Sequence, residues 1–304
     1  MKVLIAGLGS IAAKHIHALQ VIDPQCELFA IRSSEYGKPV DNVVSVYSWE
    51  EARLNGPFDF AIISNPTSEH QKTIKELVSF NCPLFIEKPV LDSLSGAKEL
   101  NSVLMSHKVF TYVACNLRFH PCIKALKTYL EEHKPVIQEV NVYCGSYLPD
   151  WRPGRNFREL YSSNAEMGGG VHLDLIHELD YLTWLMGKPD KAISYKRNDS
   201  SLKITATDYA HYVLDYKNFI ATVTLNYYRR VPKRNIEILT PDNVLLVDLL
   251  TTTFSKNGEV IFTSESTMQE TYIDQMRFFI AASRDKRLAM NDFSEALEIL
   301  KIAL

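Results

Sequence analysis

The sequence has few cysteines, and their spacing fits no common cross-linking pattern. Five occur among 304 residues, and no two of them form a C-x-x-C pair. A disulfide framework or a structural zinc site would need paired or closer spacing. We therefore expect reduced thiols, no metal site and a cytoplasmic protein. The five are Cys26, Cys82, Cys115, Cys122 and Cys144.

An excess of charge of one sign and long apolar runs are also lacking. Lysine and arginine total 33 against 36 aspartates and glutamates, a formal net charge of −3. This balance lacks the basic excess of nucleic-acid-binding proteins. No stretch reaches the roughly 18 consecutive apolar residues of a membrane span, and the apolar run after Met1 is too short for a signal peptide. We expect no nucleic-acid or membrane partner. Near-neutrality favours a small molecule held in a pocket.

The first part of the chain has the pattern of an α/β domain. Over about the first 115 residues, short apolar runs alternate with amphipathic stretches such as Glu69–Phe80 and Leu94–His107. Such alternation is typical of βαβ units around a parallel sheet covered on both faces. The predicted strands are Val3–Ala6, Leu28–Ile31, Val43–Val46, Phe60–Ile63, Leu84–Ile86 and Val109–Ala114.

The rest of the chain has a different rhythm. A helix is predicted over Val171–Met186, ended by Gly187, and residues 192–261 read as strands joined by tight turns. In residues 209–216 alternate side chains lie on opposite faces, which favours an antiparallel sheet. The predicted fold class is α/β, with a doubly wound parallel Rossmann sheet in residues 1–118. An α+β domain with a large, mainly antiparallel open-faced sheet follows in 119–290, and a helix in 291–304 returns to the first domain.

A glycine turn directly follows the first predicted strand. In the sequence Gly7-Leu8-Gly9-Ser10-Ile11-Ala12, Gly7 permits a tight turn and Gly9 lets the backbone approach a pyrophosphate. Ala12 is small enough for close packing of helix on strand. The helix that begins near Ser10 and Ile11 offers free N–H groups and its positive dipole end to phosphate. The turn therefore predicts a dinucleotide site.

The end of the second predicted strand indicates which dinucleotide. An NAD site usually has an Asp or Glu there to bind the ribose 2′-hydroxyl. This chain has Arg32, Ser33 and Ser34, which suit a 2′-phosphate. Glu35 is close enough to leave NAD as the alternative. We expect NADP as the cofactor.

Two further patterns carry candidate chemistry. Glu87-Lys88-Pro89 follows the fifth strand, at the edge where doubly wound sheets bind ligands, and Lys88 could bind a substrate hydroxyl or relay its proton. On the helix predicted over 171–186, Asp174, His177 and Asp180 recur at i, i+3 and i+6. A histidine beside a carboxylate is a plausible acid or base, although the trio could equally be the polar edge of a core helix.

Together these motifs resemble the glucose-fructose oxidoreductase / inositol dehydrogenase / rhizopine-catabolism (Gfo/Idh/MocA) family. The resemblance covers residues 1 to about 190, and the later sheet is compatible with it. The matching pieces occur in family order: Gly7–Ala12, Asn65-Pro66-Thr67-Ser68-Glu69-His70, Glu87-Lys88-Pro89, Asn116-Leu117-Arg118-Phe119-His120-Pro121 and Gly168–Asp180.

The resemblance implies hydride transfer between a nicotinamide and a carbon that bears a hydroxyl, on a sugar, sugar acid or nucleotide sugar. It implies that Lys88 and His177 handle the proton and that Asp174 orients His177 or binds substrate. Many members have this Asp and His four residues apart, not three, so Asp180 competes for the role. The implied cofactor contacts are Gly7, Gly9, Ser10, Ile11, Arg32, Ser33, Asn65, Pro66, His70, Glu87 and Asn116.

A loop rich in arginine and aromatic residues precedes the Asp174–His177 segment. Arginine can fork onto a carboxylate or phosphate, and tryptophan can stack on a sugar ring. The loop resembles a subgroup of surface-sugar and sialic-type acid enzymes, which implies an anionic or nucleotide-linked sugar. The alternative is that these side chains merely fix a long loop. The predicted substrate-binding residues are Arg118, Trp151, Arg152, Arg155 and Tyr161.

Two other functions remain open from the sequence. A minority of the family cleaves glycosidic bonds with a bound NAD that is regenerated, and a non-catalytic cofactor sensor would need only the glycine turn. We also expect a homodimer or homotetramer through the open sheet. Aromatic residues of its strands, among them Tyr212, Tyr227 and Tyr228, need cover.

Overall fold

The structure, a computed structural model, describes residues 1–32, 39–285 and 290–304. The chain divides into two compact units. Met1–Asn116 and Met268–Leu300 form the first, which we call the Rossmann unit. Leu117–Thr267 and Lys301–Leu304 form the second, the sheet unit. The division at Asn116 lies close to the predicted boundary at residue 118.

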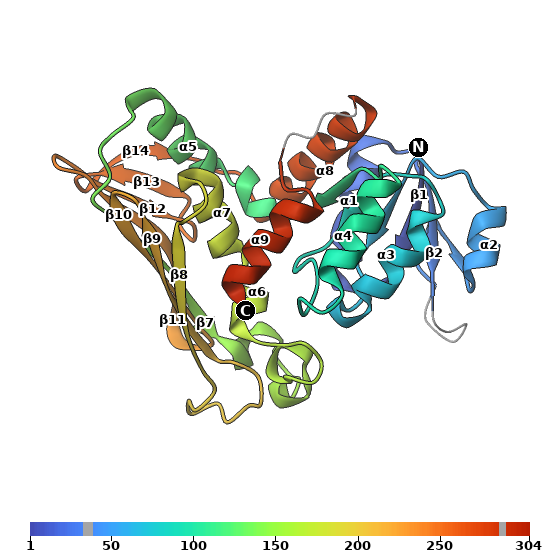
Figure 1. Cartoon of the computed structure of the whole chain (residues 1–304), viewed down its shortest axis with the longest axis horizontal. Helices are drawn as coiled ribbons and strands as arrows, with labels where there is room; N and C mark the ends of the chain where they lie inside the picture. Colours follow the sequence, from blue (N-terminus) through green and yellow to red (C-terminus); the bar gives the residue numbers. More distant parts are fainter. Residues whose placement is uncertain (33–38, 286–289) are drawn as a thin grey trace. The chain divides into compact units, whose positions relative to one another are not determined.

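The Rossmann unit contains the predicted parallel sheet. Its six strands are ordered β3-β2-β1-β4-β5-β6, and every neighbouring pair is parallel (Figure 1). This is the doubly wound order of dinucleotide-binding folds. All residues of β4 and β5 are buried, because helices cover both faces of the sheet. The strands are β1 Lys2–Ala6, β2 Glu27–Ile31, β3 Val43–Val46, β4 Phe60–Ile63, β5 Leu84–Ile86 and β6 Thr111–Val113.

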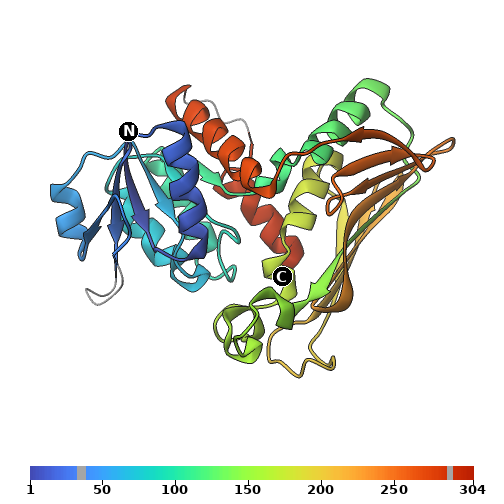
Figure 2. The same ribbon diagram turned by 180° about the vertical axis from the view of Figure 1, so that it is seen from behind.

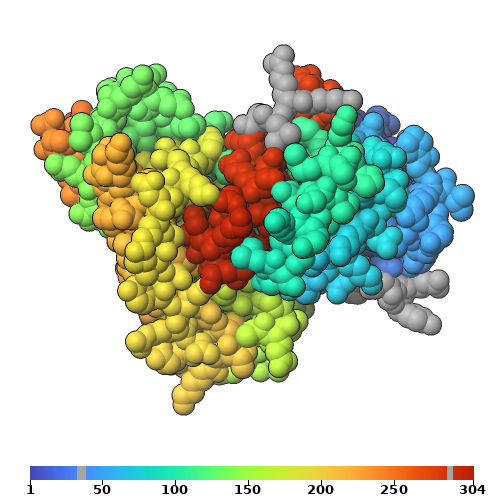
Figure 3. Space-filling view, viewed as in Figure 1, coloured from blue at the N-terminus to red at the C-terminus, as the bar shows by residue number. Residues whose placement is uncertain are grey.

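Helices cover the two faces of this sheet. Helices α3 and α4 lie on one face, and their outer surfaces form the front of the unit in Figure 3. Helix α1 lies on the other face, in front in Figure 2, and packs against α8. The helices of the unit are α1 Ser10–Ile22, α2 Trp49–Leu54, α3 His70–Val78, α4 Ala97–Ser106, α8 Met268–Asp285 and most of α9 Phe293–Ala303.

The position of α8 differs from the prediction, which placed residues up to 290 in the second domain. Phe279 of α8 is fully buried, with its ring edge-on to Phe60 of β4 and Phe85 of β5. These contacts bury the apolar side of α8 on the parallel sheet. Burial of this apolar side therefore places α8 in the Rossmann unit. Amphipathic periodicity predicts that a helix has an apolar side, but it does not indicate which of the two sheets that side will cover.

The sheet unit is built on the expected large sheet. The strand order is β14-β13-β12-β11-β7-β10-β9-β8, and all neighbours are antiparallel except β7 and β10. Helices α5, α6 and α7 lie on one face (Figures 1 and 2). The elements are α5 Pro121–His133, β7 Glu139–Tyr147, α6 Val171–Asp174, α7 His177–Met186, β8 Lys191–Arg197, β9 Tyr209–Tyr216, β10 Phe219–Asn226, β11 Tyr228–Leu239, β12 Val244–Asp248, β13 Thr253–Lys256 and β14 Glu259–Thr263.

Alternation along β9 confirms the predicted faces. Ala210, Tyr212, Leu214 and Tyr216 are buried, whereas the residues between them are partly or fully exposed. Two of the aromatic residues expected to need a partner subunit do not need one. Tyr212 and Tyr227 have no exposed surface and belong to the core, while Tyr228 is 36% exposed.

Among the residues that the structure describes, no helix combines the length and apolar character needed to cross a bilayer.

Candidate active site

Gly7, directly after β1, has a conformation that only glycine adopts easily. Its φ is +94°, and a Cβ there would lie 2.6 Å from the Cα and N atoms of Asn65. The Ser64 hydroxyl donates to the Gly7 carbonyl at 2.9 Å. The turn after β1 is therefore packed directly on the loop after β4. A side chain at position 7 would separate these two segments.

Gly9 lies in open space at the start of α1. Among the residues that the structure describes, no atom lies within 4 Å of a Cβ built on it, and both Gly9 and Ser10 are exposed. Within the described part of the chain, no side chain caps α1, and the first turn of this helix contains no acidic residue. The first N–H groups of the helix therefore lie beside space that a capping side chain would occupy in another helix. The positive end of the helix dipole makes that space favourable for an anion. The residues present fit the pyrophosphate of a dinucleotide, which the backbone at Gly9, Ser10 and Ile11 would hold.

Arg32 follows β2 at the carboxyl edge of the same sheet. Its guanidinium donates to the Ser45 hydroxyl of β3 at 3.4 Å, and its side chain is half-buried. This contact keeps the positive charge at the strand end. Ser33, the next predicted contact, lies outside the described residues, as do Ser34 and Glu35.

The loop after β4 is fixed by its own side chains. The Asn65 amide donates to the Thr73 hydroxyl at 2.8 Å, and Pro66 is exposed. His70 is buried, with its two ring nitrogens 3.1 Å and 3.2 Å from the carbonyl oxygens of Asn65 and Val90. Burial lowers the pKa of His70. We infer that His70 holds the conformation of this loop through these two contacts, because its buried ring has almost no surface that a ligand could touch.

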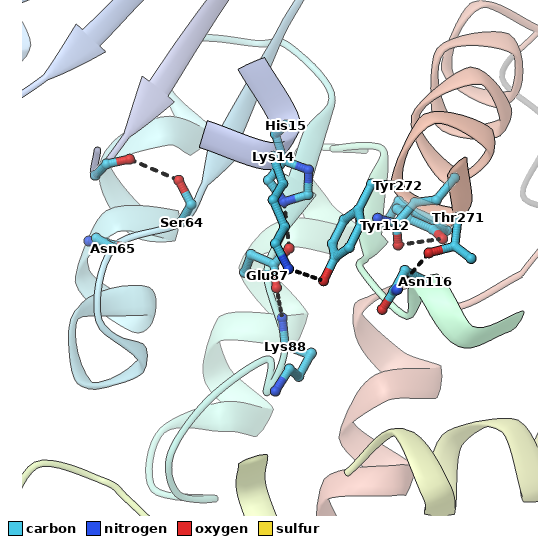
Figure 4. Close-up of polar contacts among 12 residues, drawn as sticks. Lys14, His15, Ser64, Asn65, Glu87, Lys88, Tyr112, Asn116, Thr271 and Tyr272 are labelled. Atoms are coloured by element: carbon cyan, nitrogen blue, oxygen red, sulfur yellow. Dashed lines mark hydrogen bonds and ion pairs between the residues drawn. The ribbon is translucent and has the colours of Figure 1, made fainter. Parts of the chain in front are cut away.

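Lys88 stands beside a buried carboxylate that a histidine holds. Glu87 Oε1 lies 2.5 Å from Nε2 of His15, which α1 carries beneath the sheet edge. The Lys88 backbone N–H donates to Glu87 Oε2 at 3.2 Å, and the bond from Lys88 to Pro89 is cis. Figure 4 shows the Lys88 side chain extending away from the Glu87 carboxylate. Glu87 therefore anchors the backbone of this segment, and the Lys88 ammonium is directed elsewhere.

The returning helix α8 contributes residues that the sequence pattern did not indicate. The Asn116 amide donates to the Thr271 hydroxyl at 2.8 Å (Figure 4). The Tyr272 ring lies edge-on to His15, and Lys14 contacts the Tyr272 hydroxyl at 3.4 Å. His15 had a signal in the sequence, because it shares the buried side of α1 with Ala12 and Leu19. Thr271 and Tyr272 had none.

In the sheet unit, the single helix predicted over Val171–Met186 is two helices. Helix α6 ends at Asp174, and α7 begins at His177 after the break at Leu175 and Ile176. The prediction of one helix carrying Asp174 and His177 is therefore wrong. The residue before α6 is Gly170, the last of three consecutive glycines. Its φ of +139° is a backbone conformation that residues with a side chain rarely adopt.

Asp174 contacts an aromatic pair that joins it to the predicted substrate loop. The Tyr227 hydroxyl donates to Asp174 Oδ2 at 2.5 Å. Burial, followed by the Asp174 carboxylate, raises the pKa of Tyr227 well above its usual value. Trp151 lies edge-on to the Tyr227 ring at 5.3 Å, and its indole N–H donates to Ser146. The structure thus brings Asp174, Tyr227 and Trp151 together, and Tyr227 was missed as a site residue.

The arginines of the loop differ in their surroundings. Arg152 and Arg155 are exposed in the turn around Gly154, whose φ is +81°. Arg158 donates to the Leu202 carbonyl at 3.0 Å and so fixes the loop. Tyr161 is half-buried at the start of a short 3-10 turn, Tyr161–Ser163. The contacts of Arg152, Arg155 and Tyr161 with substrate stay predictions.

Arg118, a predicted substrate contact, forms a buried ion pair. Its side chain has no exposed surface, and its Nε and Nη2 donate to the two oxygens of Asp180 at 2.9 Å and 2.6 Å. The guanidinium also lies 5.7 Å from the Trp184 ring. The ion pair with Asp180 therefore fixes the Arg118 guanidinium, and the contact of Arg118 with substrate stays a prediction. Lys88 belongs to the Rossmann unit and His177 to the sheet unit, so their joint role stays a prediction.

Fold and site define a class before any comparison: a doubly wound dinucleotide-binding unit joined to a unit built on a large antiparallel sheet. Residues 1–115 match the family model described as "Oxidoreductase family, NAD-binding Rossmann fold". Residues 137–242 match the model of the GFO/IDH/MocA C-terminal domain. The chain belongs to the Gfo/Idh/MocA oxidoreductase family.

Individual relatives agree with this assignment. The chain is 30% identical to the uncharacterized oxidoreductase YdgJ of Escherichia coli (strain K12), over 71% of this chain and 62% of the relative. It is 28% identical to the uncharacterized oxidoreductase YrbE of Bacillus subtilis (strain 168), over 60% of this chain and 53% of the relative. The chain thus spans between half and two thirds of these relatives.

A solved structure shows the same fold across the whole chain. UDP-N-acetylglucosamine 3-dehydrogenase GnnA from Acidithiobacillus ferrooxidans superposes with a TM-score of 0.80 at 19% identity. The match covers 100% of this chain and 95% of GnnA. At this identity the likeness establishes the arrangement of elements, and the substrate has to be argued from the residues of this chain.

Proposed function

We propose that the protein is an NAD(P)-dependent dehydrogenase or reductase that acts on a hydroxyl or keto carbon of a carbohydrate. The observation that carries the proposal is the uncapped, acid-free start of α1 beside the open space at Gly9, in a sheet of doubly wound order. A nicotinamide dinucleotide, when bound, supplies the acceptor or donor of the hydride. The protein supplies the proton transfer and the position of the substrate.

Lys88 and His177 are the proposed proton-handling residues. In the oxidative direction the substrate hydroxyl loses its proton either to neutral His177, with the Lys88 ammonium stabilising negative charge on the oxygen, or to Lys88 in its neutral form. Asp174 is the preferred partner for His177 or for a substrate hydroxyl, because both oxygens of its competitor Asp180 accept from Arg118. The Tyr227 hydroxyl fixes the rotamer of Asp174.

The test replaces each proposed residue by a neutral one of similar size. We expect Lys88→Met and His177→Asn each to lower turnover by at least about 10²-fold, the usual contribution of a positioned acid or base. Dinucleotide binding, followed by fluorescence titration, should be unchanged in His177→Asn. Turnover near that of the unmodified protein in both variants would refute the assigned roles.

We propose NADP as the preferred cofactor, with NAD as the alternative. The support is the Arg32 guanidinium, which Ser45 holds at the end of β2. A 2′-phosphate carries charge that a forked guanidinium binds well, and NAD lacks that phosphate. Arg32→Ala should therefore weaken NADP at least about tenfold and change NAD by less than about twofold. Equal effects on the two dinucleotides would show that Arg32 does not read the phosphate.

We propose an anionic or nucleotide-linked sugar as the substrate class. The support is the exposed pair Arg152 and Arg155 beside Trp151, whose ring contacts Tyr227 and through it Asp174. GnnA, which has the same fold, is named for a UDP-linked sugar. A panel of neutral sugars, sugar acids and nucleotide sugars, run with NAD and NADP in parallel, tests the class. Turnover of neutral sugars alone would refute it.

Two rivals are separated by simple observations. A glycosidase of the same family would retain a bound NAD on purification and would show no net absorbance change at 340 nm during turnover. A non-catalytic sensor would bind dinucleotide with no turnover on any member of the panel. The presence of both Lys88 and His177 favours the enzyme, because sensing needs only the glycine turn.

We also propose a homodimer or homotetramer through the open face of the large sheet. Within the described residues of the sheet unit, helices lie on one face only (Figures 1 and 2). The remaining face carries exposed apolar side chains of β8, β10 and β11, namely Ile193, Ile220 and Tyr228. A monomeric mass in sedimentation at micromolar concentration would refute this assembly.

A further inference from the structure

A second ion pair joins the first turn of α7, one residue after His177, to the large sheet, and its carboxylate is fully buried whereas its guanidinium side chain is 18% exposed. Glu178 has no exposed surface, and its Oε1 accepts from Nε of Arg234 at 2.6 Å. Arg234 belongs to β11, where it pairs in register with Cys144 of β7 on the helix-covered face. Burial acts to lower the pKa of Arg234, but the Glu178 carboxylate raises it overall. The pair therefore ties the start of α7 to the centre of the large sheet.

Stability does not explain why this pair is buried. The desolvation of two charges usually cancels their attraction, and apolar residues of similar volume are often as stable or more so. The geometry is also incomplete: Arg118 and Asp180 share two hydrogen bonds, whereas Glu178 and Arg234 share one. Within the described part of the chain, Arg234 Nη2 has no hydrogen-bond partner. The pair is thus better explained by the position it enforces.

The start of α7 needs such a constraint. The chain leaves helical geometry at Leu175 and returns to it at Ile176, whose apolar side chain cannot cap the new helix. Within the described residues, no side-chain cap fixes the direction in which α7 begins, and the backbone contacts there are local ones, from the Glu178 N–H to the Leu175 carbonyl at 3.3 Å and from the Asp180 N–H to the Ile176 carbonyl at 3.0 Å. Glu178 follows His177 by one residue, a rise of about 1.5 Å along the axis, so a shift of Glu178 also moves His177.

We propose that Glu178 and Arg234 are positioning residues that hold the first turn of α7, and with it the His177 imidazole, in the orientation that proton transfer requires. The proposal rests on the function proposed above for His177. It assigns no contact between Glu178 and substrate. The titratable residues around the pair are Cys144, Tyr181 and His120. Burial, followed by the charge of Arg234, lowers the pKa of His120 to about 4.

The main test replaces the charged pair by an apolar one. The double variant Glu178→Leu/Arg234→Met should keep a Tm near that of the unmodified protein, because the two charges are removed together. Its kcat should nevertheless fall roughly tenfold to hundredfold, since a small misplacement of a reacting group costs that much, while KM changes by less than about twofold. A purely structural role would lower Tm without this split.

Epistasis with His177 gives the decisive result. Adding the double variant to His177→Asn should cause no further loss of kcat, because the pair acts through His177. Losses that multiply would overturn the proposal. The proposal would also be overturned if kcat were unchanged in the double variant while His177→Asn alone lowered kcat. If His177→Asn is itself fully active, the proposed function fails instead.

Two further variants complete the design. Glu131→Gln is the matched control, because it removes a carboxylate from a surface pair with Lys127 in the same unit. It should leave Tm and kcat unchanged. Arg234→Lys keeps the charge but loses the Nε contact, and it replaces the double variant if that variant has a lowered Tm. Unaltered kcat in Arg234→Lys would then overturn the proposal.

Discussion

Neutralising Asp180 should destabilise the sheet unit by several kcal/mol. The Arg118 and Asp180 side chains are 0% and 2% exposed, and two hydrogen bonds of 2.9 Å and 2.6 Å join them. Asp180→Asn leaves the guanidinium charge buried without a countercharge on this partner. Loss of one member of a buried pair costs about 3–5 kcal/mol, a large part of a typical total of roughly 5–15 kcal/mol.

The measurement is urea unfolding followed by tryptophan fluorescence. Trp49 belongs to the Rossmann unit, whereas Trp151 and Trp184 belong to the sheet unit. In a Trp49→Phe background the signal therefore reports the sheet unit, and Trp184 lies 5.7 Å from the Arg118 guanidinium. The midpoint should fall at unchanged m, because the surface exposed on unfolding stays the same.

Two controls separate burial from charge alone. Glu131→Gln breaks an i,i+4 pair in which Glu131 is 64% exposed, and it should cost less than about 1 kcal/mol. The double variant Arg118→Met/Asp180→Leu removes both charges and should recover most of the lost stability. A loss below about 1 kcal/mol in Asp180→Asn would refute the reasoning, because it would mean that water reaches the pair.

The two glycines of the turn should separate fold from binding. Gly7→Ala should lower the stability of the Rossmann unit by roughly 1–3 kcal/mol in thermal unfolding, because its φ is +94° and a Cβ would lie 2.6 Å from Asn65 backbone atoms. Gly9→Ala should leave Tm unchanged and weaken dinucleotide binding at least about tenfold in titration, because a Cβ there fills only open space. Acid should destabilise the sheet unit, because burial lowers the pKa of His120 and His172 to about 4. The unfolded chain binds these protons first, so stability present above pH 6.5 is lost progressively towards pH 4, by up to about 3 kcal/mol for each histidine. Urea unfolding at several pH values checks the slope, which His172→Gln should roughly halve.

The parallel sheet was predictable because its strands are buried on both faces. Continuous apolar runs at Phe60–Ile63 and Leu84–Ile86 coincide with β4 and β5. Alternation predicted the faces of β9 for the same reason, since one face of that sheet lies under helices and the other does not. The unit to which α8 belongs was not predictable, because either sheet could accept its apolar side.

The sequence indicated which residues are candidates for the site, but it did not indicate which other residues contact them. Glycine, lysine and asparagine residues at strand ends carry a signal, because the carboxyl edge of a doubly wound sheet is where ligands bind. The contacts of these residues join segments far apart in sequence. His15 holds Glu87 across 72 positions, and Tyr227 holds Asp174 across 53. Such pairings are consequences of the tertiary structure, which single-sequence periodicity does not contain.

The break between α6 and α7 changes what the spacing of Asp174 and His177 means. On one continuous helix, three residues and four residues both place two side chains on a shared face, at slightly different angles. Leu175 leaves helical geometry, with φ −102° and ψ +29°, and Ile176 returns to it, so the backbone angles at Leu175 set the relation between the two side chains, and the count of residues does not. Neither residue is a glycine or a proline, and both are fully compatible with a helix, which is why the pattern predicted one. Buried contacts on each side of the break, Tyr227 with Asp174 and Arg234 with Glu178, hold the two short helices in place. A spacing one residue shorter than the family pattern is therefore compatible with a working pair, provided that those contacts fix both ends.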